Sequence, residues 1–142
     1  MTAPDVANQL NEMSRAFLPG LLGVRFTAAG ENWIEAELEV RRDLMAPNGF
    51  LHAGTVVTLA DTCCGVGCAR SLPGGATGFT TIELKSNFLG TAKEGAIACR
   101  ATAGHLGRTT QLWDAVVTNK ENGRTIALFR CAQLVLWPKP AA

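Results

Sequence analysis

The stretch Pro47-Asn48-Gly49-Phe50-Leu51-His52-Ala53-Gly54, followed by Thr55-Val56-Val57-Thr58-Leu59-Ala60-Asp61, decides how the chain is interpreted. It leads from a loop into an apolar helix that we predict from about Ala53 to Arg70. Asp61 stands inside this helix with no Lys or Arg three or four residues away. It also lies about two turns beyond the helix start, where the helix dipole no longer stabilises a carboxylate. An acid that has no stabilising partner visible in the sequence indicates a functional group.

Length and charge limit the class of protein. The chain has 142 residues, 47% of them hydrophobic, which suits one domain spanning residues 1–142. A formal net charge of +1 gives too weak a field to gather nucleic acid or an anionic membrane surface. The segment from Thr2 to Arg15 lacks the basic and apolar runs of a signal peptide, and no apolar stretch reaches spanning length. We predict a soluble cytoplasmic protein with neither nucleic acid nor membrane as partner.

The chain has an odd number of cysteines and no secretory signal, a pattern typical of reduced, buried thiols. They are Cys63, Cys64, Cys68, Cys99 and Cys131. Cys64 and Cys68 have a spacing that could hold a metal, but there is no CxxC pair, and His52 and His105 lie in unrelated segments. No base or positive field is visible near Cys63 or Cys64 to make a nucleophile. We expect packing thiols, no metal site and no cofactor.

The first part of the chain predicts a helix and a hairpin. Apolar residues recur at helical spacing from Val6 to Phe17, and Pro19-Gly20 is expected to close that helix. Segments 23–27 and 33–40 alternate apolar and polar residues around a turn, as in a β-hairpin. Residues 41–51 are expected to be loop. The central helix is rich in small residues, which lets a backbone approach it closely.

Extended runs follow the break at residues 71–75, and they are separated by short turns. The runs are Gly78 to Phe88, Gly95 to Gly104, Thr109 to Asn119, and Thr125 to Trp137. Long strands joined by short turns predict an antiparallel meander. The fold class is therefore α+β, with one long helix against a sheet of about six strands. One helix cannot cover both faces of such a sheet, so we expect a homo-oligomer.

The element order, together with the segment 49–54 leading to Leu59-Ala60-Asp61, resembles the hotdog-fold acyl-CoA thioesterases, in particular the phenylacetate-pathway (PaaI-like) branch. In that family a G-x-x-H-G-G turn opens the hotdog helix, and an L-x-D lies eight residues beyond the first Gly of the His-Gly-Gly triplet. Asp61 lies eight residues beyond Ala53. Two positions depart from the pattern, since Ala53 replaces that Gly and Ala46 replaces a usual amide residue. Asn48 is the candidate to substitute for the missing amide.

The resemblance implies a chemistry for this segment. Backbone N–H groups of Ala53 and Gly54, free at the helix start, would polarise a thioester carbonyl. Asp61 would act as general base on water or as the nucleophile, and burial would raise its pKa. The structural alternative for Asp61 is a buried acid bonded to a strand backbone. His52 either orients the site or simply caps the helix.

Further site residues come from the strands and turns. Thr81 aligns with a Ser or Thr that positions water in some relatives, with Thr80 as the competing choice. The turn residues Arg108 and Thr109 resemble a turn that contacts coenzyme A phosphates, although a surface Arg explains them equally well. The loop residues Phe50 and Leu51 are expected to line the acyl pocket. The large side chains expected in the core or an interface are Trp33, Phe88, Trp113 and Trp137.

We therefore expect a hotdog dimer in which Asp61 of one subunit lies near Asn48, His52 and Ala53 of the other, with two dimers forming a tetramer. The expected reaction is hydrolysis of an acyl-CoA to a free acid and CoA, with an aryl-acetyl or medium-chain acyl group. One alternative is a hotdog dehydratase or hydratase, whose usual pairing of a His with a carboxylate in a different motif is not found here. Another is a non-catalytic acyl-CoA sensor, which would need the amides and Arg108 but not Asp61.

Overall fold

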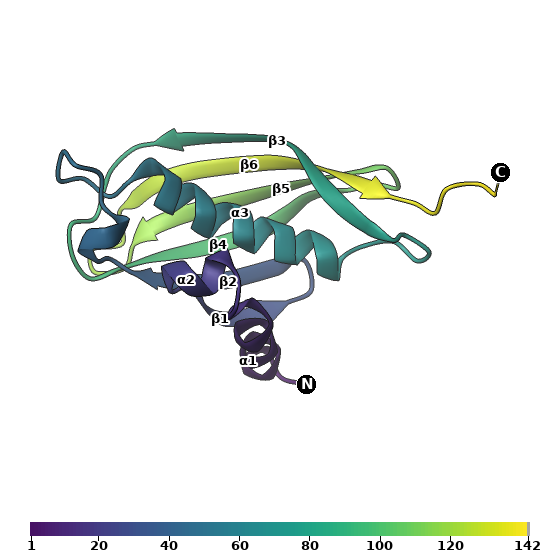
Figure 1. The fold of residues 1–142 in the computed structure, drawn as a ribbon, viewed down its shortest axis with the longest axis horizontal. Coiled ribbons are helices and arrows are strands. Elements are labelled where there is room, and N and C mark those ends of the chain that lie inside the picture. Colours follow the sequence, from purple (N-terminus) through teal and green to yellow (C-terminus); the bar gives the residue numbers. More distant parts are fainter. Residues whose placement is uncertain (142) are drawn as a thin grey trace.

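The central helix α3 lies across one face of a six-stranded antiparallel sheet, in a computed structural model that describes residues 1–141 (Figure 1). The strand order is β1-β2-β4-β5-β6-β3. The elements are α1 (Ala3–Ser14), α2 (Leu18–Leu22), β1 (Arg25–Gly30), β2 (Trp33–Glu39), η1 (Arg42–Leu44), α3 (Ala53–Arg70), β3 (Gly78–Phe88), β4 (Ala96–Leu106), β5 (Thr110–Asn119) and β6 (Thr125–Leu136). This is the hotdog arrangement predicted from the sequence. None of the helices in this part of the chain is long and apolar enough to cross a membrane.

The N-terminal prediction needs several corrections, one of which is that the first strand covers Arg25–Gly30 and not residues 23–27. The first helix ends at Ser14, and Met13 and Phe17 are exposed, not buried on its apolar face. Pro19 does not close a helix but occupies the first turn of α2, where its missing N–H costs nothing. Gly23, with φ of 86°, then ends α2 in the left-handed conformation that glycine adopts without strain. The predicted loop at 41–51 also contains the short 3-10 helix η1.

Small residues let α3 approach the sheet closely. A Cβ atom at Gly67 would overlap the ring of Trp113, which is fully buried on β5. The Trp113 Nε1–H donates to Gln111 Oε1 at 2.8 Å, and Gln111 Nε2 donates to the carbonyl of Ser71 at 2.9 Å, next to the helix C-terminus. All five cysteines are free and buried, as expected for packing thiols. The core is therefore built from a narrow helix and a sheet that wraps it.

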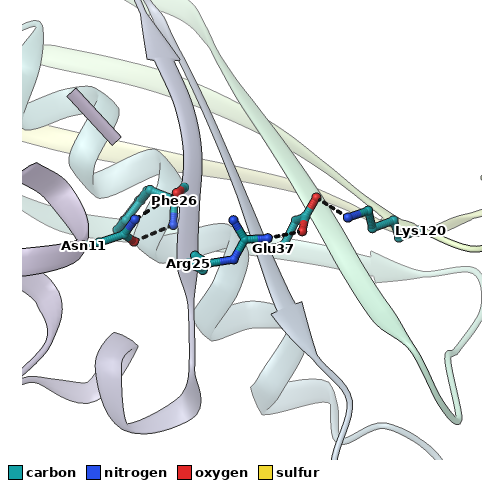
Figure 2. A network of polar contacts seen from close by, with 5 residues as sticks. All are labelled: Asn11, Arg25, Phe26, Glu37 and Lys120. Atoms are coloured by element: carbon teal, nitrogen blue, oxygen red, sulfur yellow. Dashed lines mark hydrogen bonds and ion pairs between the residues drawn. The ribbon is translucent and has the colours of Figure 1, made fainter. Parts of the chain in front are cut away.

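The two edges of the sheet differ. At the β1 edge, α1 packs against the strand, and the Asn11 amide accepts from Phe26 N–H at 2.7 Å and donates to Phe26 C=O at 3.0 Å (Figure 2). Glu37 on β2 also pairs with Arg25 at 2.7 Å and Lys120 at 2.8 Å. At the other edge, no strand within residues 1–141 pairs with the free side of β3. Its residue Ile82 is 57% exposed.

Candidate active site

A tight loop leads the chain into α3. Met45 and Leu51 form an isolated antiparallel bridge, and Gly49 turns the chain between them with φ of 87°. The Asn48 Oδ1 accepts the backbone N–H of Phe50 at 3.2 Å, so this side chain holds the turn together. No hydrogen bond within residues 1–141 engages its NH₂ group, which stays the proposed substitute for the amide missing at position 46.

His52 caps the N-terminus of α3, which is one of the two roles predicted for it from the sequence. Its Nδ1 accepts the backbone N–H of Gly54 at 2.8 Å, so in the neutral ring Nε2 carries the proton. This corrects the predicted pair of free amides, because the Gly54 N–H is already engaged. A Cβ atom at position 54 would lie 2.9 Å from His52 Nδ1, which explains why a glycine follows two residues after the histidine.

Ala53 is the first residue of the helix, and its N–H finds no acceptor within residues 1–141. Ala53 lines an apolar cavity of about 450 Å³ between the loop and the end of β3. The cavity is lined by Phe50, Leu51, Ala53, Val56, Phe88, Gly90 and Thr91. Phe50 and Leu51 both line this cavity, and their role in an acyl pocket stays a prediction. Phe88 does not belong to the core, because β3 is an edge strand and leaves the ring half exposed beside the cavity.

Asp61 is half-buried on α3, and its Oδ1 is fully buried with no hydrogen-bond partner among the described residues. A strand backbone therefore does not hold it, contrary to the structural alternative. Burial raises the pKa of Asp61 above its usual value of 3.8. The contact of Cys64 with Cys131, together with burial, raises the pKa of Cys64, so this thiol is not a nucleophile.

Ala53 and Asp61 lie at different points along one helix. Eight residues separate them, which is about 12 Å along the axis at ~1.5 Å per residue. A thioester carbonyl held by the Ala53 N–H is therefore beyond hydrogen-bonding reach of the Asp61 carboxylate in the same chain.

The structure separates the two threonine candidates on β3. Thr81 pairs with Gln133 on β6, which is buried on the face that α3 covers, and so Thr81 faces the helix. Thr80 pairs with Leu134 and faces the opposite side of the sheet, because successive strand residues alternate. Thr80 is therefore not part of the surroundings of Asp61. A β-bulge at Ile82 follows Thr81 directly.

The β4–β5 turn with Arg108 and Thr109 lies at the other end of the molecule. The hydrogen bond from Gln111 to Ser71 ties the start of β5 to the C-terminus of α3, and this helix has 18 residues, or about 27 Å. The Arg108 guanidinium lies over the Trp137 ring at 4.6 Å, and its carbonyl accepts from Trp137 Nε1 at 3.0 Å. Within one chain this turn does not meet Ala53.

Sequence reasoning missed two buried glutamines that lie side by side on neighbouring strands. Gln111 and Gln133 are paired in register, and both are 0% exposed. A signal was present in the sequence: Gln133 has the same strand parity as Cys131 and Val135, which face the core. A polar residue at a core position indicates a specific hydrogen-bond partner.

Comparison with known proteins identifies the family. Residues 48–126 match the model of the thioesterase superfamily, and the chain belongs to this family of thioester hydrolases. A thioesterase of Haemophilus influenzae has a similar structure, with a TM-score of 0.85 and 29% identity over 92% of this chain and 90% of that one. A protein of Pasteurella multocida, whose name gives esterase as its expected activity, is 33% identical over 80% of this chain and 81% of its own. The 1,4-dihydroxy-2-naphthoyl-CoA hydrolase of Listeria monocytogenes is 28% identical over 78% of this chain and 88% of its own length.

The PaaI protein of Escherichia coli has the same fold, with a TM-score of 0.79 over 95% of this chain and 96% of that one. Sequence identity is 20%, so the likeness is one of fold alone. The prediction is confirmed for the superfamily, while the branch stays a prediction.

Proposed function

We propose that the protein is an acyl-CoA thioesterase that releases a free acid and CoA, with Asp61 as the catalytic carboxylate and the Ala53 N–H polarising the thioester carbonyl. The observation that carries the proposal is the buried oxygen of Asp61, without a partner among the described residues, on the same helix whose first residue, Ala53, lines an apolar cavity. A helix N-terminus stabilises developing negative charge on a carbonyl oxygen. A desolvated carboxylate is a stronger base near neutral pH.

Hydrolysis then needs one water. Asp61 takes a proton from the water as its oxygen bonds to the acyl carbon, and negative charge collects on the carbonyl oxygen held by Ala53. The C–S bond breaks as the tetrahedral state collapses, and the proton held by Asp61 passes to the CoA sulfur, which leaves as the thiol and restores the carboxylate. Direct attack by Asp61, forming an anhydride that water then cleaves, uses the same residues and stays open.

The active site is proposed to form between two copies of the chain. One chain holds Ala53 and Asp61 about 12 Å apart along α3. The free edge of β3, with exposed Ile82, favours antiparallel pairing with a second copy. Such a pair would bring Asp61 of one subunit toward Asn48, His52 and Ala53 of the partner subunit. It would also offer Arg108 and Thr109 of a second subunit to the CoA phosphates, and two dimers would make a tetramer.

The substrate is proposed to carry an aryl-acetyl or medium-chain acyl group, in a cytoplasmic enzyme of the PaaI-like branch. A cavity of about 450 Å³ with apolar walls suits an acyl group of that size. The name of the Listeria relative, which acts on an aromatic acyl-CoA, supports testing aryl substrates first.

A proline at position 53 tests the proposed amide. Proline is well tolerated at the first position of a helix, and His52 before it has an extended backbone with φ of −63° and ψ of 134°. Ala53→Pro therefore removes one N–H and leaves the helix in place. We expect kcat for an acyl-CoA panel to fall by about 10²- to 10³-fold in a thiol-release assay, with an unchanged melting temperature. Unchanged kcat would refute the role of this amide.

Mixing two inactive variants tests the shared site. Neither Ala53→Pro nor Asp61→Asn is expected to hydrolyse substrate alone, but a mixed dimer contains one site with both native groups. Unfolding and refolding an equal mixture should restore roughly a quarter of wild-type activity by two-fold symmetry. No recovery would place the whole site within one chain or refute the pairing.

The same Asp61→Asn variant distinguishes an enzyme from a sensor. A catalyst loses turnover and keeps its affinity for acyl-CoA, measured by calorimetry. A sensor loses little of either.

A further inference from the structure

The side chain of Gln133 connects a buried position on β6 to the surface of β3. Its Oε1 accepts from the Thr81 hydroxyl at 2.7 Å, and its Nε2 donates to the Cys131 sulfur at 3.3 Å. Gln133 is completely buried, whereas Thr81 is exposed on the helix side of the edge strand. Burying an amide side chain costs free energy unless its polar atoms are hydrogen-bonded, so the partners of a buried amide are informative. Here the bond reaches outward to one exposed hydroxyl.

The direction of this hydrogen bond decides what Thr81 can do. A hydroxyl has one proton to donate and two lone pairs that accept. Because the proton of Thr81 is given to Gln133 Oε1, the free side of the hydroxyl oxygen can only accept. Thr81 is thereby fixed as an acceptor for an O–H group arriving from the open side of β3.

Thr81 lies in the part of β3 that runs past Asp61. One turn beyond Asp61 on α3, a Cβ atom at Gly65 would lie 3.6 Å from the ring of Phe79, two residues before Thr81 on the same face of the strand. The contact of Gly65 with Phe79 and the cavity shared by Val56 and Phe88 therefore place Thr81 about level with Asp61 along α3.

We propose that Gln133 is a positioning residue that holds the Thr81 hydroxyl as an acceptor for the hydrolytic water, so that this water is oriented between Thr81 and Asp61. The inference rests on the proposed thioesterase function. One O–H of the water donates to Asp61 and the other donates to the Thr81 hydroxyl oxygen. This leaves a lone pair of the water oxygen directed at the acyl carbon. Only the first proton is transferred, and Thr81 and Gln133 keep theirs.

Gln111 provides a matched control on the neighbouring strand. It pairs with Gln133 in register and is equally buried, but its amide bonds to Trp113 and to the carbonyl of Ser71. Those partners belong to the core and to the end of α3. Gln111→Met and Gln133→Met therefore remove the same group from the same layer of the sheet, and only the second change releases Thr81.

The experiment measures kcat and KM for wild type, Gln133→Met, Gln111→Met, Thr81→Val, Thr81→Ser and the double variant of Thr81→Val with Gln133→Met, with a thermal melt of each. We expect Gln133→Met and Thr81→Val each to lower kcat by about 10- to 100-fold through misplacement of the water. KM should change by less than about twofold, because the lost contact acts on the water and not on bound substrate. Thr81→Ser should retain activity, and the double variant should be no slower than Thr81→Val alone.

Several results overturn the inference. A kcat for Gln133→Met no lower than that of Gln111→Met would make Gln133 a structural residue. Multiplying effects in the double variant would mean that the two side chains act independently. Wild type that releases no CoA from any acyl-CoA would instead overturn the proposed function itself, a result distinct from both. Because Thr81 is exposed, its variants keep the test valid even if Gln133→Met folds poorly.

Discussion

The two edges of the sheet carry opposite chemistry. The β1 edge is closed, since α1 covers it, Asn11 satisfies both backbone groups of Phe26, and Glu37 joins Arg25 to Lys120 (Figure 2). At the β3 edge, the outer side of the strand has no partner strand within residues 1–141, an apolar cavity lies at one end, and the half-buried Asp61 lies on the helix that covers this sheet. One edge is therefore closed by side-chain hydrogen bonds, and the other leaves the outer backbone of a strand without a partner strand in the described residues.

This difference separates stability from function. A closed edge protects the backbone from unwanted pairing, whereas an open apolar edge invites a partner. A second subunit and a substrate are proposed to meet at the open edge, and Asp61, whose Oδ1 has no partner among the described residues, is the proposed catalytic group there. Changes at the open edge should therefore alter assembly and turnover, and changes at the closed edge should alter stability alone.

The largest effect is expected from a charge on the open edge. A lysine at position 82 resists strand pairing, so Ile82→Lys should split the assembly into monomers and lower activity by about 100-fold or more, because each site loses half its groups. Light scattering after gel filtration and the thiol-release assay measure both. Leu21→Lys, at an exposed leucine of α2, is the matched control and should change neither. A monomer with full activity would contradict the shared site.

Asp61 is expected to be needed for activity and to lower the stability of the folded protein at neutral pH. Burial raises the pKa of Asp61, so the acidic limb of kcat/KM should lie above the usual value of 3.8. Because the pKa of Asp61 is higher in the folded protein than in the unfolded chain, the free energy of unfolding falls as the pH rises from about 3.8 through the folded-state value. Asp61→Asn should therefore lower kcat by about 10²-fold and raise the melting temperature at neutral pH. The gain in melting temperature should disappear below pH 3.8, and a gain that persists there would contradict the cause.

At the closed edge, Asn11→Ala leaves the N–H and C=O of Phe26 without their partner. We expect a loss of about 1–3 kcal/mol in the free energy of unfolding, measured by urea denaturation, with kcat unchanged. A drop in kcat in the folded variant would mean that the closed edge also shapes the site.

The smallest effect is expected at Glu37, which is paired at the surface with Arg25 and Lys120. Because both cations are more than half exposed, Glu37→Gln should cost no more than about 1 kcal/mol, and less at high salt. Urea denaturation at two salt concentrations tests this, and a larger, salt-independent loss would indicate a role beyond ion pairing.

Much of the fold could be predicted because the signals are local. The spacing of small and apolar residues gave the correct bounds of α3, and the break at residues 71–75 gave those of β3. Asp61 could be singled out because an acid without a partner is visible in a helical pattern. The end of the first helix was wrong because its last apolar residues, Met13 and Phe17, find nothing to pack against.

Other features depend on contacts between distant segments. That Gly54 has lost its free amide follows from the rotation of the His52 ring, which no spacing reveals. Arg108 lies at the far end of α3 because β4 runs the length of the sheet before it turns. Gln133 matters only because Thr81, 52 residues earlier, lies opposite it.

The sequence by itself determined the class of fold, the helix that carries the carboxylate, and the loop that begins it, because periodicity and turn chemistry act between near neighbours. Only the tertiary structure decided which amide is free, which threonine faces the carboxylate, and which edge of the sheet stays open. These depend on strand register and side-chain packing, where a shift of one residue moves every side chain to the other face.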